Sequence, residues 1–280
     1  MGKKLRADLE KLSDQKRDNI MKNLEFFNRN QARDFINKNK PMAIIPTGSV
    51  EQHLNHLFIG MDINSATRIA QDLAEKFSDD VIFYRPLNAG IAEHHMAFPG
   101  TMTLRVNTFI GVLTDIVESL IRGGVKKILF INGHGGNVEP MATAMRNISL
   151  QMKGIHEGID TTEVRTHYDY EELLNKDSEI DIRYTSYWET HDEDFIKNII
   201  DDDVWPGHAG EYETSVALYM FPDLVDKDAI KNDPLGTSTN ASKEKGEQIY
   251  IDIINQYKHF KLISKYKIMK KLLILFLILL

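Results

Sequence analysis

The chain has 280 residues, a formal net charge of −7 at neutral pH and no cysteine. The absence of cysteine excludes thiol nucleophiles, disulfides, iron–sulfur clusters and thiolate zinc sites. The acidic balance argues against a nucleic-acid partner, because phosphate binding needs basic residues. A hydrophobic content of 42% with 27% charged residues is typical of a globular protein with a substantial core, so the chemistry must come from backbone groups, carboxylates and the ten histidines.

The start of the chain, residues 1–40, is rich in charged side chains and is predicted to form a helical extension. It lacks the apolar run of a secretory signal peptide. We therefore expect a cytoplasmic protein whose catalytic domain occupies residues 41–266.

Apolar runs alternate with amphipathic segments through the first half of the chain. Three short runs have the composition of buried strands, at 42–45, 81–84 and 127–131. Segments with helical periodicity separate and follow them, at 66–77, 109–124 and 139–151. This rhythm predicts an α/β fold built from parallel β-α units with right-handed crossovers. The run at 163–168 is a candidate for a further strand, and the polar stretch 171–206 is interpreted as an irregular insertion or substrate loop.

The chain ends in nine consecutive apolar residues, 272–280, directly after Lys270 and Lys271. As a helix they would span only about 14 Å, whereas the hydrocarbon core of a membrane is roughly 30 Å thick. We therefore expect no membrane span. The tail, 267–280, either docks into a groove of the same or a neighbouring chain or is a dispensable appendage.

Polar clusters follow the predicted strands, where ligands bind in open α/β folds. Six of the ten histidines lie in four loops of this kind: His53, His56, His94, His95, His134 and His208. Glu51 and His53 alternate, which on an extended segment points both side chains the same way. His134 stands between glycines, which allow a ligand to approach closely. Carboxylate and imidazole ligands without thiolate suit Zn, Mn or Fe(II).

A charge count indicates how many metal ions these side chains would hold. Glu51, Asp62 and Glu211 supply three negative charges, whereas His53 and His134 are neutral ligands. Two divalent ions with one hydroxide would neutralise this set, while a single ion would leave a negative site that opposes deprotonation of its water. We therefore expect two divalent ions with a bridging carboxylate.

Four ordered motifs between Pro41 and Leu224 make the chain resemble the creatininase family of metal-dependent amidohydrolases. They are Thr-Gly-Ser-Val-Glu-Gln-His at 47–53 with Asp62 beyond it, Phe-Pro-Gly-Thr at 98–101, Asn-Gly-His-Gly-Gly-Asn at 132–137, and His-Ala-Gly-Glu-Tyr-Glu-Thr-Ser at 208–215. The resemblance implies a three-layer α/β/α sandwich with a mostly parallel sheet. It also implies two divalent ions per subunit (Zn, Mn or Fe) and a homo-oligomer, usually a hexamer.

The resemblance also implies roles for individual residues. The metal ligands would be Glu51, His53, Asp62 and His134, with Asp62 as the bridge. In creatininase proper a glutamate two residues after the loop histidine completes the site, but Gly136 stands there in this chain. We therefore expect Glu211 to be the fifth ligand, ahead of Glu213. His208 would assist ring opening or proton transfer, so His208 and Glu211 are the predicted catalytic residues.

The substrate pocket is less well defined by the motifs. In creatininase proper an aromatic residue follows the loop histidine, whereas this chain has Gly135. Trp188 and Trp205 resemble, or lie near, the tryptophans that wall the creatinine pocket, with packing in the core or an interface as the alternative. With His95 and Gly135 they are the predicted substrate-binding residues, and creatinine itself stays open as the substrate.

The predicted reaction is hydrolysis of a C–N bond in a small or cyclic, creatinine-like amide by attack of a metal-bridging water. Within the same family, a deformylase or a peptide-maturation hydrolase is the alternative. A further alternative, which is not an enzyme, is a non-catalytic metal-binding scaffold subunit. The only partners expected are a small-molecule amide and further copies of the chain, with no nucleic acid and no membrane.

Overall fold

The computed structural model of the protein describes residues 23–77, 79–158 and 178–257. The predicted helix before residue 23, the candidate strand at 163–168, residues 171–177 and the apolar tail lie outside the described residues. The chain divides into two compact units, which are treated separately below. The sheet unit comprises Met1–Gln52 with Ile59–Ser186, and the C-terminal unit comprises His53–Phe58 with Tyr187–Leu280. The catalytic domain bounds of 41–266 stay a prediction.

A four-stranded parallel sheet with the order β2-β1-β3-β4 forms the centre of the sheet unit. Its strands are β1 (Met42–Thr47), β2 (Val81–Phe83), β3 (Lys127–Asn132) and β4 (Asp181–Ser186). The first three are the strands expected from the sequence, so the α/β class is confirmed. The interpretation of 171–206 as irregular was wrong in part, because it contains β4. Among the described residues β4 lies at the edge of the sheet. It alternates polar and apolar residues from Asp181 to Thr185, and its Asp181 and Arg183 pair through a 2.6 Å contact between Oδ2 and Nη2.

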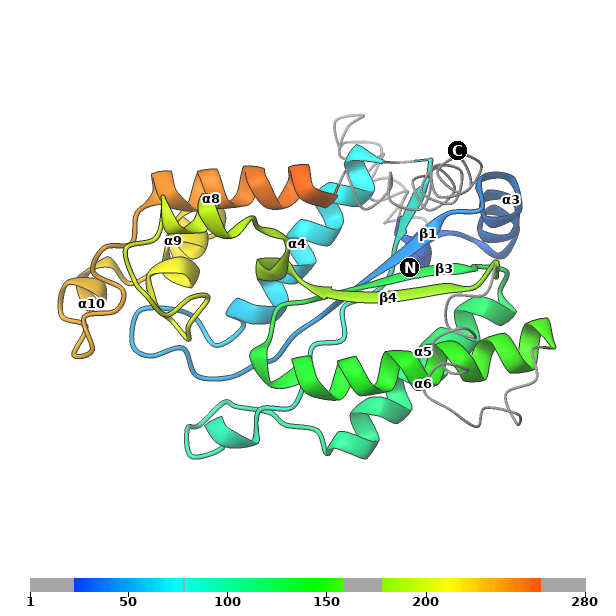
Figure 1. Ribbon diagram of the computed structural model, residues 1–280, viewed down its shortest axis with the longest axis horizontal. Helices are drawn as coiled ribbons and strands as arrows, with labels where there is room; N and C mark the ends of the chain where they lie inside the picture. Colours follow the sequence, from blue (N-terminus) through cyan, green and yellow to red (C-terminus); the bar gives the residue numbers. More distant parts are fainter. Residues whose placement is uncertain (1–22, 78, 159–177, 258–280) are drawn as a thin grey trace, which may run out of the picture. The chain divides into compact units, whose positions relative to one another are not determined.

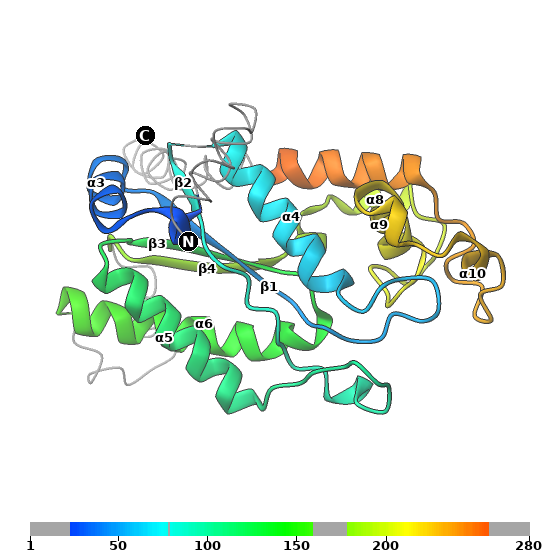
Figure 2. The same ribbon diagram turned by 180° about the vertical axis from the view of Figure 1, so that it is seen from behind.

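Helices cover both faces of this sheet, which makes the three layers visible in Figures 1 and 2. Helix α4 (Met61–Lys76) contacts β1, β2 and β3, while α6 (Val138–Glu157) contacts β4 and α5 (Val106–Arg122). The expected helices are thus present, although α4 and α5 begin five and three residues earlier than the periodicity indicated and α6 extends to Glu157. Helix α3 (Arg29–Asn39) precedes β1 and starts at a capping box between Asn28 and Gln31.

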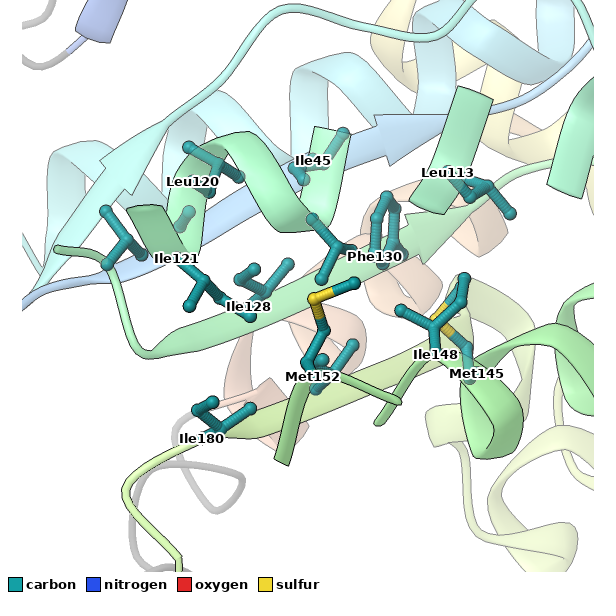
Figure 3. Packing of buried hydrophobic residues seen from close by; sticks show 14 of the residues in the cluster. Ile45, Leu113, Leu120, Ile121, Ile128, Phe130, Met145, Ile148, Met152 and Ile180 are labelled. Carbon is teal, nitrogen blue, oxygen red and sulfur yellow. The ribbon is translucent and has the colours of Figure 1, made fainter. Parts of the chain in front are cut away.

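The main core lies between the sheet and the pair α5 and α6 (Figure 3). Ala43 and Ile45 of β1 belong to this core, and so do Ile128 and Phe130 of β3. Because strand side chains alternate, the intervening Ile44, which is also buried, points to the opposite face. A sheet buried on both faces explains why the strands read as continuous apolar runs.

The regular elements described in the C-terminal unit are helices, joined by irregular segments. It contains α8 (Glu193–Lys197), α9 (Glu211–Met220), α10 (Lys227–Lys231) and a helical stretch over 243–257. Single 3-10 turns complete the two units: η1 (Leu24–Phe26), η2 (Glu93–His95), η3 (Gly135–Asn137), η4 (Tyr187–Thr190) and η5 (Pro222–Leu224). No helix among the described residues is both long enough and apolar enough to cross a membrane.

Candidate active site

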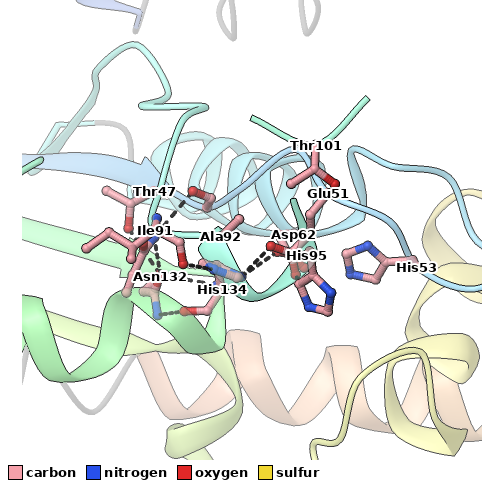
Figure 4. Close-up of polar contacts among 12 residues, drawn as sticks. Thr47, Glu51, His53, Asp62, Ile91, Ala92, His95, Thr101, Asn132 and His134 are labelled. Atoms are coloured by element: carbon pink, nitrogen blue, oxygen red, sulfur yellow. Dashed lines mark hydrogen bonds and ion pairs between the residues drawn. The ribbon is translucent and has the colours of Figure 1, made fainter. Parts of the chain in front are cut away.

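Three buried ligand-type side chains meet at the carboxyl ends of β1 and β3 (Figure 4). Glu51 follows β1, Asp62 lies in the first turn of α4, and His134 lies two residues after the end of β3. The Nδ1 atom of His134 lies 2.9 Å from Oδ2 of Asp62 and 3.3 Å from Oε2 of Glu51. We call these three residues the carboxylate–histidine cluster. The sequence predicted each of them as a metal ligand, and the fold of the sheet unit brings them together.

The loop after β3 fixes the orientation of the His134 ring. Nε2 of His134 lies 2.9 Å from the carbonyl oxygen of Ile91, and since a carbonyl can only accept, Nε2 must donate. In the neutral ring the lone pair is then on Nδ1, which faces the two carboxylates. Asn132 holds the loop by donating to the carbonyl of His134 at 2.8 Å, and Asn137 accepts from the amide of Ile91 at 3.0 Å. This arrangement suits an imidazole that binds a metal through Nδ1.

Two glycines of the same loop leave no room for a side chain. A Cβ atom at Gly133 would lie 2.2 Å from the carbonyl oxygen of Asp62, and one at Gly136 would lie 2.2 Å from that of Ile91. Gly136 would also place its Cβ 2.5 Å from Nε2 of His134. A glutamate at position 136, where creatininase proper has one, therefore does not fit this loop. At Gly135, in contrast, a Cβ would meet nothing within 4 Å.

His95, predicted to bind substrate, contacts the carboxylate of Glu51, and its contact with substrate stays a prediction. Its Nε2 atom lies 3.4 Å from Oε1 of Glu51, and its Nδ1 atom lies 2.9 Å from Nε2 of Gln52. His94 stacks on His134 with ring centroids 5.9 Å apart. The two neighbouring histidines thus support residues of the carboxylate–histidine cluster.

The donor set of this cluster fits a divalent ion with oxygen and nitrogen ligands. One ligand atom from each of Glu51, Asp62 and His134 lies within 4.8 Å of the others. Burial alone would lower the pKa of the His134 imidazole, but the hydrogen bonds and charges of Asp62 and Glu51 outweigh it and raise this pKa to about 10. The metal-free protein therefore carries a proton where a metal would bind, and metal binding must release it.

The metal-free protein is expected to lose stability as the pH rises from about 6.5, the pKa of an unfolded histidine, to the folded pKa of His134, about 10. Over this window the folded state holds one proton more than the unfolded state, so its stability falls by up to about 1.4 kcal/mol per pH unit. Below the window the stabilisation is complete. Urea unfolding of the chelated protein at a series of pH values measures this loss of stability. The free energy of unfolding of His134→Gln, measured in the same way, should lack the decline. Parallel profiles would contradict a charged His134.

A second group of ligand-type side chains lies within the C-terminal unit. The rings of His53 and His208 pack with centroids 4.5 Å apart, and Nε2 of His53 is 4.0 Å from Oε2 of Glu213. The backbone amide of Ala209 donates to the same Oε2 atom at 2.6 Å. We call His53, His208 and Glu213 the histidine–glutamate cluster. His53 and His208 were singled out from the sequence, and Glu213 was ranked behind Glu211.

Glu211 is engaged in a different set of contacts. Its Oε2 atom accepts hydrogen bonds of 2.9 Å from the backbone amides of Asp201 and Asp202, and Oε1 forms an ion pair with Lys245. Positions 211 and 213 are about 200° apart around a helix, so the two carboxylates of α9 point to opposite sides. Helical phase therefore separates the two positions without indicating which of them binds metal.

The two tryptophans predicted to bind substrate belong to an aromatic group within the C-terminal unit. Trp188 is buried and meets Tyr187 edge to face at 5.2 Å. Trp205 packs on Tyr212 at 6.1 Å and on His191 at 6.5 Å. These contacts give both side chains a packing role, and their predicted contact with substrate stays a prediction.

Comparison with known proteins finds that the chain is similar to members of one family. The model of the family Creatininase, described as creatinine amidohydrolase, matches residues 26–241. The creatinine amidohydrolase of Pseudomonas putida is 26% identical over 249 residues, which cover 74% of this chain and 84% of the relative. The mycofactocin precursor peptide peptidase of Mycolicibacterium smegmatis is 26% identical over 243 residues, which cover 77% of this chain and 82% of the relative. A solved structure described as creatininase with Mn has a TM-score of 0.67 at 21% identity, covering 83% of this chain and 94% of its own.

Proposed function

Because the chain belongs to the creatininase family, whose model matches residues 26–241, we propose that it is a metal-dependent hydrolase that cleaves a C–N bond of a small or cyclic amide. The observation that carries this proposal is the carboxylate–histidine cluster. Two carboxylates and one oriented imidazole are buried at the carboxyl edge of a parallel sheet, which is where α/β enzymes bind their ligands. An intact ligand set also argues against a non-catalytic metal-binding scaffold subunit, because loss of catalysis would usually remove one of these groups.

We further propose two divalent ions per chain, with Zn, Mn or Fe as the candidates. Glu51, Asp62 and His134 are the proposed ligands from the sheet unit, and His53 and Glu213 are those from the C-terminal unit. The Mn of a structurally similar creatininase and the oxygen and nitrogen donors of this chain support the choice of metals. Glu213 replaces Glu211 in this set because the carboxylate of Glu211 is already bound to Lys245 and two backbone amides.

Divalent ions held by these residues would supply Lewis acidity that polarises the amide carbonyl and lowers the pKa of a water molecule. The chain's own groups prepare the site. The carbonyl of Ile91 holds His134 with Nδ1 toward the carboxylates, and His95 lies against Glu51. His208, packed on His53, is the proposed donor of a proton to the leaving nitrogen, because an imidazole changes protonation near neutral pH.

A second candidate substrate class is a peptide amide. The chain is as similar to a mycofactocin precursor peptide peptidase as to a creatinine amidohydrolase, at 26% identity in each case. Gly135 also stands where creatininase proper has an aromatic residue, and it leaves open space there. A deformylase activity is a third possibility within the family. The predicted hexamer and cytoplasmic location stay predictions.

The experiment that tests the function uses the wild-type chain. Its content of Zn, Mn and Fe is measured, the metal is removed with a chelator, and each ion is added back. Every form is then incubated with creatinine, formamides and short peptides while ring-opened product, formate and released amine are followed. We expect about two equivalents of metal and an activity that disappears with chelation and returns with metal. A chain that binds no divalent ion and hydrolyses none of these amides would contradict the proposal.

A further inference from the structure

His56 is a buried histidine of the C-terminal unit that the proposed chemistry does not use. Its Nε2 atom lies 3.0 Å from the carbonyl oxygen of Ala209 and 2.9 Å from Oγ1 of Thr214. The carbonyl can only accept, so Nε2 carries the hydrogen and donates to it. Burial lowers the pKa of His56, which agrees with a neutral ring. His56 is therefore a fixed hydrogen-bond donor.

The residue that His56 holds has an unusual backbone. Ala209 has a φ of +52°, in the left-handed region that non-glycine residues rarely adopt. Three side chains bind its two peptide groups: Glu213 accepts from its amide at 2.6 Å, while His56 and Thr214 donate to its carbonyl at 3.0 and 3.3 Å. The main chain of His56 is anchored as well, because its own carbonyl accepts from the amide of Asp226 at 2.9 Å. The left-handed turn at Ala209 is thus held from both sides.

Each member of the histidine–glutamate cluster is next to a part of this arrangement in the sequence. His208 precedes Ala209, Glu213 precedes Thr214, and His53 starts the segment 53–58 that carries His56. A change in the hydrogen bond from His56 to Ala209 is therefore expected to shift the residues that carry the proposed chemistry. Of the three side chains that bind Ala209, only Glu213 is also a proposed metal ligand. His56 and Thr214 have no proposed contact with metal or substrate.

We propose that His56 is a positioning residue that holds the left-handed turn at Ala209 and thereby orients His208 and Glu213. The inference rests on the proposed function, since that function gives His208 and Glu213 their roles. His56 does not contact substrate in this proposal. It acts on the chemistry through the turn, because its Nε2–H donates a hydrogen bond to the carbonyl of Ala209. The side-chain amide of a glutamine could donate the same hydrogen bond.

The first test uses the metal-free chain without substrate. Hydrogen exchange followed by mass spectrometry compares the wild type with His56→Ala, His56→Gln and the matched control His156→Ala on α6. Loss of a buried hydrogen bond should speed exchange over residues 207–214 by at least about tenfold in His56→Ala. Gln places an amide nitrogen near the position of Nε2, so His56→Gln should recover most of the protection, and the control should match the wild type. If His56→Ala does not fold, Thr214→Val is measured in its place, because valine keeps the shape of threonine and removes the hydroxyl. Faster exchange over residues 207–214 is expected for this variant too.

The second readout is the affinity for Mn²⁺ alone. Removing a residue that orients a ligand weakens metal binding by roughly 10- to 100-fold. The affinity of His56→Ala for Mn²⁺ should fall by about that factor, and the affinity of His56→Gln should fall less. Faster exchange spread equally over 207–214 and 243–257 would indicate general destabilisation and overturn the proposal. Unchanged exchange at 207–214 would overturn it as well. A wild-type chain that binds no Mn²⁺ would count against the proposed function, and the exchange comparison would still decide the role of His56.

Discussion

Glu213→Gln is expected to lower kcat/KM by more than about a hundredfold, whereas Glu211→Gln is expected to leave it within a few-fold of the wild type. Glu213 faces His53 at 4.0 Å, and a proposed metal ligand should cost more than the roughly 10- to 100-fold lost with an outer partner. Glutamine keeps the size of the side chain and removes its charge, so the comparison isolates the carboxylate. Metal content and steady-state kinetics of the two variants measure the difference.

The effect of Glu211→Gln should be on stability. The substitution leaves Lys245, whose side chain is 22% exposed, facing an amide in place of a buried carboxylate. Removing one partner of a buried ion pair is strongly destabilising, and the partial exposure of Lys245 reduces this to about 2–3 kcal/mol. The matched control is Glu118→Gln, which removes an exposed ion pair with Arg122 on α5 and should cost less than about 1 kcal/mol. Loss of metal in Glu211→Gln together with its retention in Glu213→Gln would support the assignment made from the sequence.

The fold was predictable where apolar residues dominate. The strands at 42, 81 and 127 are buried on both faces over most of their length, so their sequences are mainly apolar and their residue types identify them. The edge strand β4 was not recognised, because one of its faces is polar and the ion pair between Asp181 and Arg183 lies on the strand itself. An alternating edge strand of six residues has a weak signal beside an irregular polar loop.

The candidate site was predictable where a motif is short and rigid. His134 follows a strand between glycines, and Glu51 follows the neighbouring strand, so the topology of a parallel sheet was enough to bring them together. The choice between Glu211 and Glu213 depended on the phase of one helix, which four motif residues do not determine. The contact of His95 with Glu51 depends on the path of the loop from β2 to η2, and no periodicity in the sequence describes such a path.

Gly246→Ala is expected to destabilise the protein by at least about 3 kcal/mol, the upper part of the range for overpacking. Gly246 lies in the helical stretch 243–257, and a Cβ atom there would lie 1.9 Å from the carbonyl oxygen of Ser215 and 2.5 Å from its carbonyl carbon. Both are backbone atoms of α9, so no side chain can move aside to make room. The methyl group would force the two helices apart.

The same two helices are joined by buried polar contacts, which makes this separation costly. His191 links them, with Nδ1 2.7 Å from Oδ2 of Asp252 in the 243–257 stretch and Nε2 2.7 Å from the hydroxyl of Tyr212 on α9. The ion pair between Lys245 and Glu211 is a second link. Moving the helices apart would leave these groups without their partners in a buried environment.

Gly111→Ala is the matched control for this prediction. Gly111 lies within α5, and a Cβ atom there would meet nothing within 4 Å. The same methyl group should therefore stabilise the protein by about 0.5–1 kcal/mol, because alanine favours a helix over glycine. Urea unfolding of the two variants compares one chemical change in two surroundings. Equal stability of Gly246→Ala and Gly111→Ala would contradict the close approach of the two helices at Gly246 and Ser215.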